Sequence, residues 1–228
     1  MFRDDYQDAA LLCLLWYLFG RASDLSLVCK ENLSIDAADV LFMRFIRMKT
    51  TEEQGLSLFP DADFITCPLY AMVLALTTQA APCVDLLDNL PVLPIQAAVT
   101  LSPATPLLVQ RLLLRLRHVN GFDGLTHRWI FDRGAWNMST TNKGFNYIFN
   151  TSREGHKASK VLSGYATEAK VLLSDMKHFD TQMQEKINAV QCFLFMTYCK
   201  LESSKFNVSQ HVIDVLTAYL ILHYQLLK

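Results

Sequence analysis

The first stretch of the chain shows apolar residues at helical spacing. Within residues 5–19, apolar side chains recur at helical spacing, at Ala9, Leu12, Cys13, Trp16 and Phe19. This period matches the turn of an α-helix, so the pattern predicts a helix over residues 5–19. We expect Gly20 to end this helix as a C-terminal cap, and Ser23 or Asp24 to start a new one.

The pattern changes to a two-residue alternation after residue 39. In "DVLFMRFIRMKT" (39–50), one set of side chains alternates with another: Phe42, Arg44, Ile46 and Met48 against Met43, Phe45, Arg47 and Lys49. We expect "EEQG" to form a turn and "LSLF" to form a second strand, so residues 40–59 are predicted to be a β-hairpin. The helical pattern returns over residues 67–79, where Pro68 suits the first turn of a helix.

The later segments are predominantly helical in pattern. Residues 107–119 form an amphipathic stretch with Arg111, Arg115 and His118 on one face. Residues 139–150, "STTNKGFNYIFN", predict a short helix with Ser139 as its N-cap. Further helices are predicted over residues 155–163, 180–201 and 207–226. These elements together predict an α+β fold that is mostly helical and contains one small antiparallel sheet.

Residues 80–106 differ from the rest of the chain in composition. They contain five of the seven prolines and only two charged residues, Asp85 and Asp88. This composition predicts a poorly packed excursion and not a helix or a sheet. The chain is thereby divided into residues 1–79, 80–106 and 107–228, and we expect the first and last parts to form one domain.

The overall composition is that of a globular protein with a substantial core. Of the 228 residues, 51% are hydrophobic and 19% are charged. The N-terminal apolar run follows acidic residues, which argues against a secretory signal, and no uninterrupted apolar run is long enough to predict a membrane span. The six cysteines form no C-x-x-C pair, which favours buried reduced thiols and an intracellular location.

The net charge of −1 is unevenly distributed along the chain. Residues 1–78 carry six Lys/Arg and eleven Asp/Glu, whereas residues 107–160 carry nine Lys/Arg and three Asp/Glu. A basic segment with interspersed aromatic residues is typical of a nucleic-acid surface, although solvated helices also have this composition. The candidate DNA-binding residues in this segment are Arg111, Arg115, Arg128, Arg133 and Lys143.

Four residues suited to phosphodiester chemistry occur in a specific order. Arg21 lies in "GRASDL" after the first predicted helix, and Lys49 lies at the predicted hairpin; Trp136 follows "GA", and Tyr147 comes eleven residues later. In this order and with these flanking residues, the chain resembles the catalytic domain of tyrosine recombinases. It looks most like the recombinases of Crypton-type transposons and their oomycete and fungal relatives. The resemblance covers residues 5–78 and 119–226.

The resemblance implies a chemical role for each of the four residues. Arg21 would clamp the non-bridging phosphate oxygens and stabilise the charge of the transition state. Tyr147 would attack phosphorus and hold the strand covalently, while Lys49 would protonate the leaving 5′ oxygen. Trp136 would donate its indole N–H to a phosphate oxygen or pack against the helix of Tyr147. The implied partner is DNA, on which copies of the protein would form a homo-oligomer, and no metal or other cofactor is required.

Each of these residues also has a simpler structural interpretation. Arg21 could cap the C-terminus of a helix. Lys49 could be a solvated hairpin residue, and Trp136 could belong to the core. Tyr147 could form part of an aromatic face with Phe145 and Phe149. The order, spacing and flanking residues of the four, taken together, favour the recombinase interpretation over these alternatives.

One expected motif is missing from the chain. Tyrosine recombinases place a His-x-x-Arg box before the Trp, and it supplies the second phosphate-clamping arginine. No histidine here is followed by Arg three residues later. Arg111, Arg115 and Arg117 lie where a substitute would be expected. Loss of one clamp costs roughly two to three orders of magnitude in rate. The sequence therefore resembles a truncated or degenerate copy, which we expect to lack the DNA-clamping domain that this family places before the catalytic domain.

Three hypotheses of function follow from the sequence. The first is a transposon-derived protein that binds DNA with impaired or lost strand cleavage and rejoining. The second is an active DNA strand-transferase with a tyrosine nucleophile. The third is a helical interaction protein with no role on DNA. The missing box favours the first hypothesis over the second, and the basic segment favours DNA contact over the third. For a protein acting on DNA we expect an intracellular location, with the nucleus as the candidate compartment.

Overall fold

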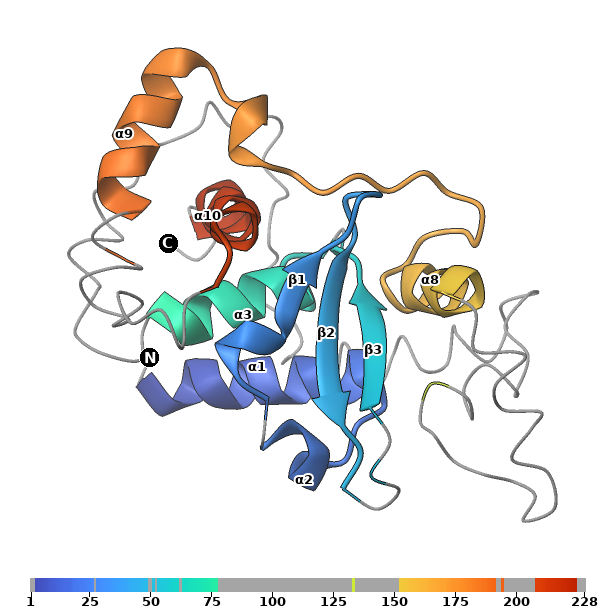
Figure 1. Cartoon of the computed structure of the whole chain (residues 1–228). Coiled ribbons are helices and arrows are strands. Elements are labelled where there is room, and N and C mark those ends of the chain that lie inside the picture. The colour runs from blue at the N-terminus through green and yellow to red at the C-terminus, as the bar shows by residue number, and fades with distance from the viewer. Residues whose placement is uncertain are drawn as a thin grey trace, which may run out of the picture.

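The computed structural model describes residues 3–26, 28–48, 51, 53–61, 63–77, 133, 152–191, 194 and 208–224. Its N-terminal elements are α1 (Arg3–Leu18), α2 (Ala22–Leu25), the 3-10 helix η1 (Lys30–Asn32), β1 (Leu33–Ile35), β2 (Leu41–Ile46), β3 (Glu53–Leu58) and α3 (Pro68–Thr77). The later elements are α8 (Ser152–Leu162), the 3-10 helix η2 (Met176–His178), α9 (Thr181–Gln191) and α10 (Gln210–Tyr224). The described residues form an α+β structure that is mostly helical, as the sequence predicts (Figure 1).

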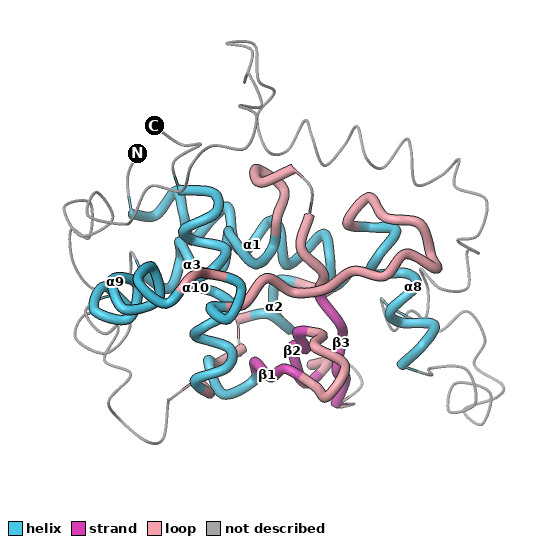
Figure 2. The backbone as a smooth tube through the Cα atoms, turned by 90° about the horizontal axis from the view of Figure 1, so that it is seen from above, coloured by secondary structure: helices cyan, strands magenta, loops and turns pink. Residues whose placement is uncertain are grey.

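The three strands form one antiparallel sheet in the order β1-β2-β3. Helices α1 and α3 lie side by side behind this sheet (Figure 1), and the view from above shows them as a separate layer (Figure 2). Helix α10 packs against α3 and reaches β1, whereas α8 packs against β3 at the opposite edge. The sheet is therefore held between helices that come from both ends of the sequence.

Helix α1 ends one residue earlier than the sequence predicts. Phe19 adopts a φ of 47°, in the left-handed region that ends a helix, so the prediction that Gly20 supplies this conformation is wrong. Gly20 is needed for space instead. A Cβ atom at this position would lie 3.2 Å from Cγ of Leu25. The absence of a side chain thus allows α2 to pack closely against the end of α1.

The predicted hairpin is present, but its turn lies earlier than expected. Glu53 and Gly55 of the "EEQG" stretch belong to β3, where they pair with Ile46 and Arg44 of β2. The connection between the strands therefore falls in residues 47–52, and "EEQG" is not the turn. Strand β1 was not predicted, because its three residues are too few for an alternating pattern to be visible.

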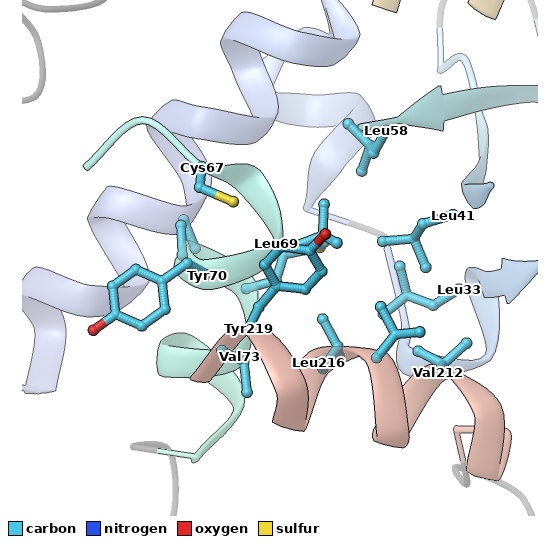
Figure 3. Packing of buried hydrophobic residues seen from close by; sticks show 14 of the residues in the cluster. Leu33, Leu41, Leu58, Cys67, Leu69, Tyr70, Val73, Val212, Leu216 and Tyr219 are labelled. Carbon is cyan, nitrogen blue, oxygen red and sulfur yellow. The ribbon is translucent and has the colours of Figure 1, made fainter. Parts of the chain in front are cut away.

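The main core lies between the sheet, α1, α3 and α10. Leu41, Met43 and Phe45 point into it from β2, as the two-residue alternation predicts. Figure 3 shows side chains of α3 and α10 meeting those of the strands, including Leu69, Val73, Leu216 and Tyr219. Helix α3 is buried on nearly all sides because α1 and α10 both cover it. Its sequence is correspondingly apolar around the whole helix and not along one stripe.

The predicted helices after residue 150 are found with shifted ends. The helix predicted over 155–163 is α8, and the one predicted over 207–226 is α10. The helix predicted over 180–201 is α9 as far as Gln191, beyond which only residue 194 is described. The predictions for residues 80–106, 107–119 and 139–150 lie outside the described residues.

The three cysteines that the structure describes differ in exposure. Cys13 and Cys67 are buried and unoxidised, as predicted, whereas Cys29 is exposed. Burial raises the pKa of Cys13 to about 12 and that of Cys67 to about 11, so both remain protonated thiols at neutral pH. They act as small apolar side chains of the core and not as nucleophiles.

Candidate functional site

Of the four predicted catalytic residues, only Arg21 is among the described residues. Lys49, Trp136 and Tyr147 lie outside them, as do Arg111, Arg115, Arg128 and Lys143 of the predicted DNA-binding set. Arg133 of that set is among the described residues. The described part of the candidate site consists of Arg21 and of the residues that contact its segment of chain.

Arg21 occupies the N-cap position of the short helix α2. Its backbone is extended, with φ −83° and ψ 153°, and its side chain is exposed. The main-chain N–H of Arg21 donates to Oδ2 of Asp24 over 3.3 Å. Among the described residues, no hydrogen bond or ion pair of its guanidinium is found. Arg21 therefore presents an uncommitted positive charge on a turn whose main chain is fixed.

The Asp24 carboxylate joins this turn to the end of strand β2. It is 1% exposed, and its Oδ1 accepts the main-chain N–H of Met48 over 3.0 Å. Its Oδ2 accepts both the Arg21 N–H and Nη1 of Arg47, the latter at 3.2 Å. Burial by itself would raise the pKa of Asp24, but the main-chain donors of Met48 and Arg21 and the Arg47 guanidinium outweigh it, so its pKa is lowered.

Arg47 is the centre of the polar interior next to Arg21. Its side chain is 4% exposed, and besides Asp24 it contacts the end of α1. Nη2 donates to the carbonyl oxygen of Leu18 over 3.3 Å, and Nη1 donates to that of Phe19 over 3.4 Å. A cation at this position also interacts favourably with the negative end of the helix dipole. Burial lowers the pKa of Arg47, and the Asp24 carboxylate opposes that change.

Gln54 and Arg133 also contact Arg47. We call Asp24, Arg47, Gln54 and Arg133 the buried arginine network. Nε of Arg47 donates a hydrogen bond to Oε1 of Gln54, in β3, over 2.7 Å. The carbonyl oxygen of Arg133 accepts Nη2 of Arg47 over 2.7 Å and the Gln54 amide over 3.4 Å. The network thus links α2, the residue that follows β2, strand β3 and residue 133.

The guanidinium of Arg133 points into the interior. The residue is 3% exposed and donates to the carbonyl oxygens of Tyr17, Ser57 and Gly155, and to the hydroxyl of Ser159. Burial and the nearby charge of Arg47 lower the pKa of Arg133 to about 9, which leaves it protonated at neutral pH. Its donors are directed to protein acceptors, so this guanidinium lies in the interior and is not exposed to solvent. It ties α1, β3 and α8 together instead.

Sequence reasoning did not assign a role to Arg47 or Gln54. The signal for Arg47 was present, because the alternation of β2 puts it in one set with Met43 and Phe45, whose side chains are buried. An arginine in the buried phase of a strand requires acceptors, since an unpaired buried charge is very costly. No comparable signal in the sequence identifies Gln54, which is buried by the pairing of β3 with β2.

The described residues place limits on other kinds of site. They contain no group of three or more His, Cys, Asp or Glu side chains that could hold a metal ion. No helix among them has the length and apolar character to cross a membrane. Comparison of the chain with protein-family models, curated proteins and solved structures yields no match.

Proposed function

We propose that this protein is a tyrosine-recombinase-like DNA-binding protein in which strand cleavage and rejoining are impaired. The observation that carries the proposal is the pair of main-chain hydrogen bonds that the Asp24 carboxylate accepts. One carboxylate binds the main chain of Arg21 and that of Met48, the residue before Lys49. Two segments that the resemblance assigns to one active site are therefore tied together at the main chain.

The order of the elements also supports the proposal. A helix is followed by Arg21 at the start of a short helix, then by a three-stranded antiparallel sheet, and then by a helix that begins at Pro68. Lys49 belongs to the connection between β2 and β3. This is the order that the recombinase resemblance implies for the first half of the catalytic domain.

The expectation of impaired cleavage rests on the second phosphate clamp. The sequence has no His-x-x-Arg box. Arg133 belongs to the basic segment of residues 107–160 and is among the described residues. Its guanidinium donates to the carbonyl oxygens of Tyr17 and Ser57. One arginine clamp stabilises less of the transition-state charge than two, so DNA binding should persist better than chemistry.

A binding experiment tests the DNA half of the proposal. We expect duplex DNA to bind at low salt and to be released at moderate salt, because binding through a few phosphate contacts is weak and weakens further as salt rises. Arg21→Ala and Arg128→Ala should each weaken binding several-fold. Arg44→Ala is the matched control, since Arg44 is an exposed arginine of β2 whose partner is Glu53 at 3.7 Å. No binding at low salt would favour a helical interaction protein without a DNA role.

A covalent-capture experiment tests whether strand cleavage is impaired. The protein is incubated with a nicked suicide duplex, and adducts are sought on a denaturing gel. We expect little or no adduct. A strong adduct that disappears in Tyr147→Phe would contradict impaired cleavage and identify the chain as an active strand-transferase. Such a result would direct attention to Arg111, Arg115 and Arg117 as the source of the second clamp.

A further inference from the structure

The Arg47 side chain contacts the turn that carries Arg21 from the interior. Arg47 donates to the carbonyl oxygens of Leu18 and Phe19, which precede Arg21, and to the carboxylate of Asp24, which follows it. The segment from Leu18 to Asp24 therefore has contacts with Arg47 on both sides of Arg21. Arg21 itself is exposed at the outer side of this bend.

The same side chain is itself fixed in the interior. Its Nε donates to Gln54 over 2.7 Å, its Nη2 donates to the carbonyl of Arg133 over 2.7 Å, and its guanidinium lies 4.5 Å from the ring centroid of Phe45. A planar guanidinium with five N–H donors can serve all of these acceptors at once. A lysine has a single ammonium group and cannot.

The turn needs such support because its backbone is unfavourable by itself. Phe19 has a φ of 47°, a conformation that costs a non-glycine residue roughly 1–2 kcal/mol. Its carbonyl oxygen and that of Leu18 lie at the end of α1, where helical hydrogen bonds are no longer available. The contacts with Arg47 stabilise this conformation and satisfy both carbonyls.

We propose that Arg47 is a positioning residue for Arg21: together with Asp24 it fixes the main chain of the Leu18–Asp24 turn, from which the exposed Arg21 side chain can bind a phosphate group. The ligand in this inference, a DNA phosphodiester, rests on the proposed function. Arg47 does not touch the phosphate. It lowers the conformational freedom that Arg21 would otherwise lose on binding, which is how preorganisation increases affinity.

A double-mutant cycle tests the coupling between Arg47 and Arg21. Binding of duplex DNA at low salt is measured for the wild type, Arg47→Lys, Arg21→Ala and the double variant. We expect Arg47→Lys to weaken binding roughly several-fold when Arg21 is present and to have almost no further effect when Arg21 is absent. Equal losses in both backgrounds would overturn the inference, because they would show that Arg47 affects binding independently of Arg21. Arg44→Lys, which changes an exposed arginine of strand β2, is the control and should show no coupling.

A second measurement tests the positioning without DNA. Native-state hydrogen exchange should show the amides of Arg21 and Met48 protected in the wild type, because both donate to Asp24. In Arg47→Lys, or in Asp24→Asn if the first variant does not fold, we expect faster exchange at these two amides while the β2–β3 ladder stays protected. Unchanged protection would overturn the positioning role whatever the DNA result. Loss of protection in a protein that never binds DNA would retain the positioning role and reject the proposed function.

Discussion

Arg133 carries a positive charge into the interior, where main-chain oxygens from distant parts of the chain surround it. Tyr17, Ser57 and Gly155 provide these carbonyls, and Ser159 provides a hydroxyl. Among the described residues, the acceptors of this guanidinium are neutral, so its charge is stabilised by dipoles and not by a carboxylate. A buried group of this kind is strongly dependent on every one of its hydrogen bonds.

Removal of the Arg133 side chain should therefore be severely destabilising. Arg133→Ala removes the hydrogen bonds that this guanidinium donates to the buried carbonyls of Tyr17 and Ser57, and a buried hydrogen bond from a charged group contributes about 1.5–3 kcal/mol. We expect the free energy of unfolding to fall by at least about 3 kcal/mol, measured by urea denaturation. Arg44→Ala, which removes an exposed ion pair, should change it by less than about 1 kcal/mol. Equal effects of the two substitutions would contradict the interior role of Arg133.

His223 is a buried ionisable residue for which a pH effect can be derived. Its ring lies among Phe64, Tyr70 and Tyr219, and its Nδ1 has no hydrogen-bond partner among the described residues. Burial lowers its pKa from 6.5 to about 4. Between pH 6.5 and about pH 4, His223 therefore binds a proton more readily in the unfolded chain than in the folded protein. The stability associated with neutral His223 is present above pH 6.5 and is lost as the pH falls toward 4.

Replacement of His223 should reduce this acid sensitivity. We expect the urea midpoint of the wild type to fall between pH 6.5 and pH 4, and that of His223→Phe to fall less, because phenylalanine keeps an aromatic ring and has no proton to bind. Some slope should remain, since burial also lowers the pKa of His156. A variant with the same slope as the wild type would show that His223 is not the titrating group.

At the scale of secondary-structure elements, the helices with the strongest burial are also those that the sequence predicts best. Helices α3 and α10 are long apolar segments, and both were expected at nearly their observed positions. Turns were predicted less well. The end of α1 depends on Phe19, and the hairpin turn depends on strand pairing that places Gly55 opposite Arg44. Local residue preference does not determine either feature, because tertiary contacts decide both.

The two faces of α10 provide a test of its packing. Leu216 is fully buried against α3 and the sheet, whereas Leu222 of the same helix is 36% exposed. Leu216→Ala should lower the free energy of unfolding by about 2–5 kcal/mol, because it removes buried apolar surface and leaves a cavity. Leu222→Ala should have a much smaller effect in the same thermal or urea denaturation. Similar losses for both variants would mean that α10 does not pack as described.

At the scale of the whole molecule, the sequence predicts the fold class, whereas it does not predict the contacts that surround Arg21. The α+β class and the segment with Arg21 follow from periodicity and from "GRASDL". The buried arginine network does not, because Asp24, Arg47 and Arg133 are far apart in sequence and meet only in three dimensions. Basic charge in the sequence does not distinguish an arginine that faces solvent from one that bridges elements in the interior. Arg133 belongs to the basic segment, yet its side chain is buried.

The placement of α3 between α1 and α10 also affects how the chain can fold during synthesis. Helix α1 precedes α3 and is available to it early, but α10 is the last of the described elements to leave the ribosome. Until then, the side of α3 that α10 will cover has no partner from that helix. A nascent chain halted before residue 210 would expose this apolar surface, and we expect it to be bound by chaperones or to aggregate instead of accumulating as a folded intermediate.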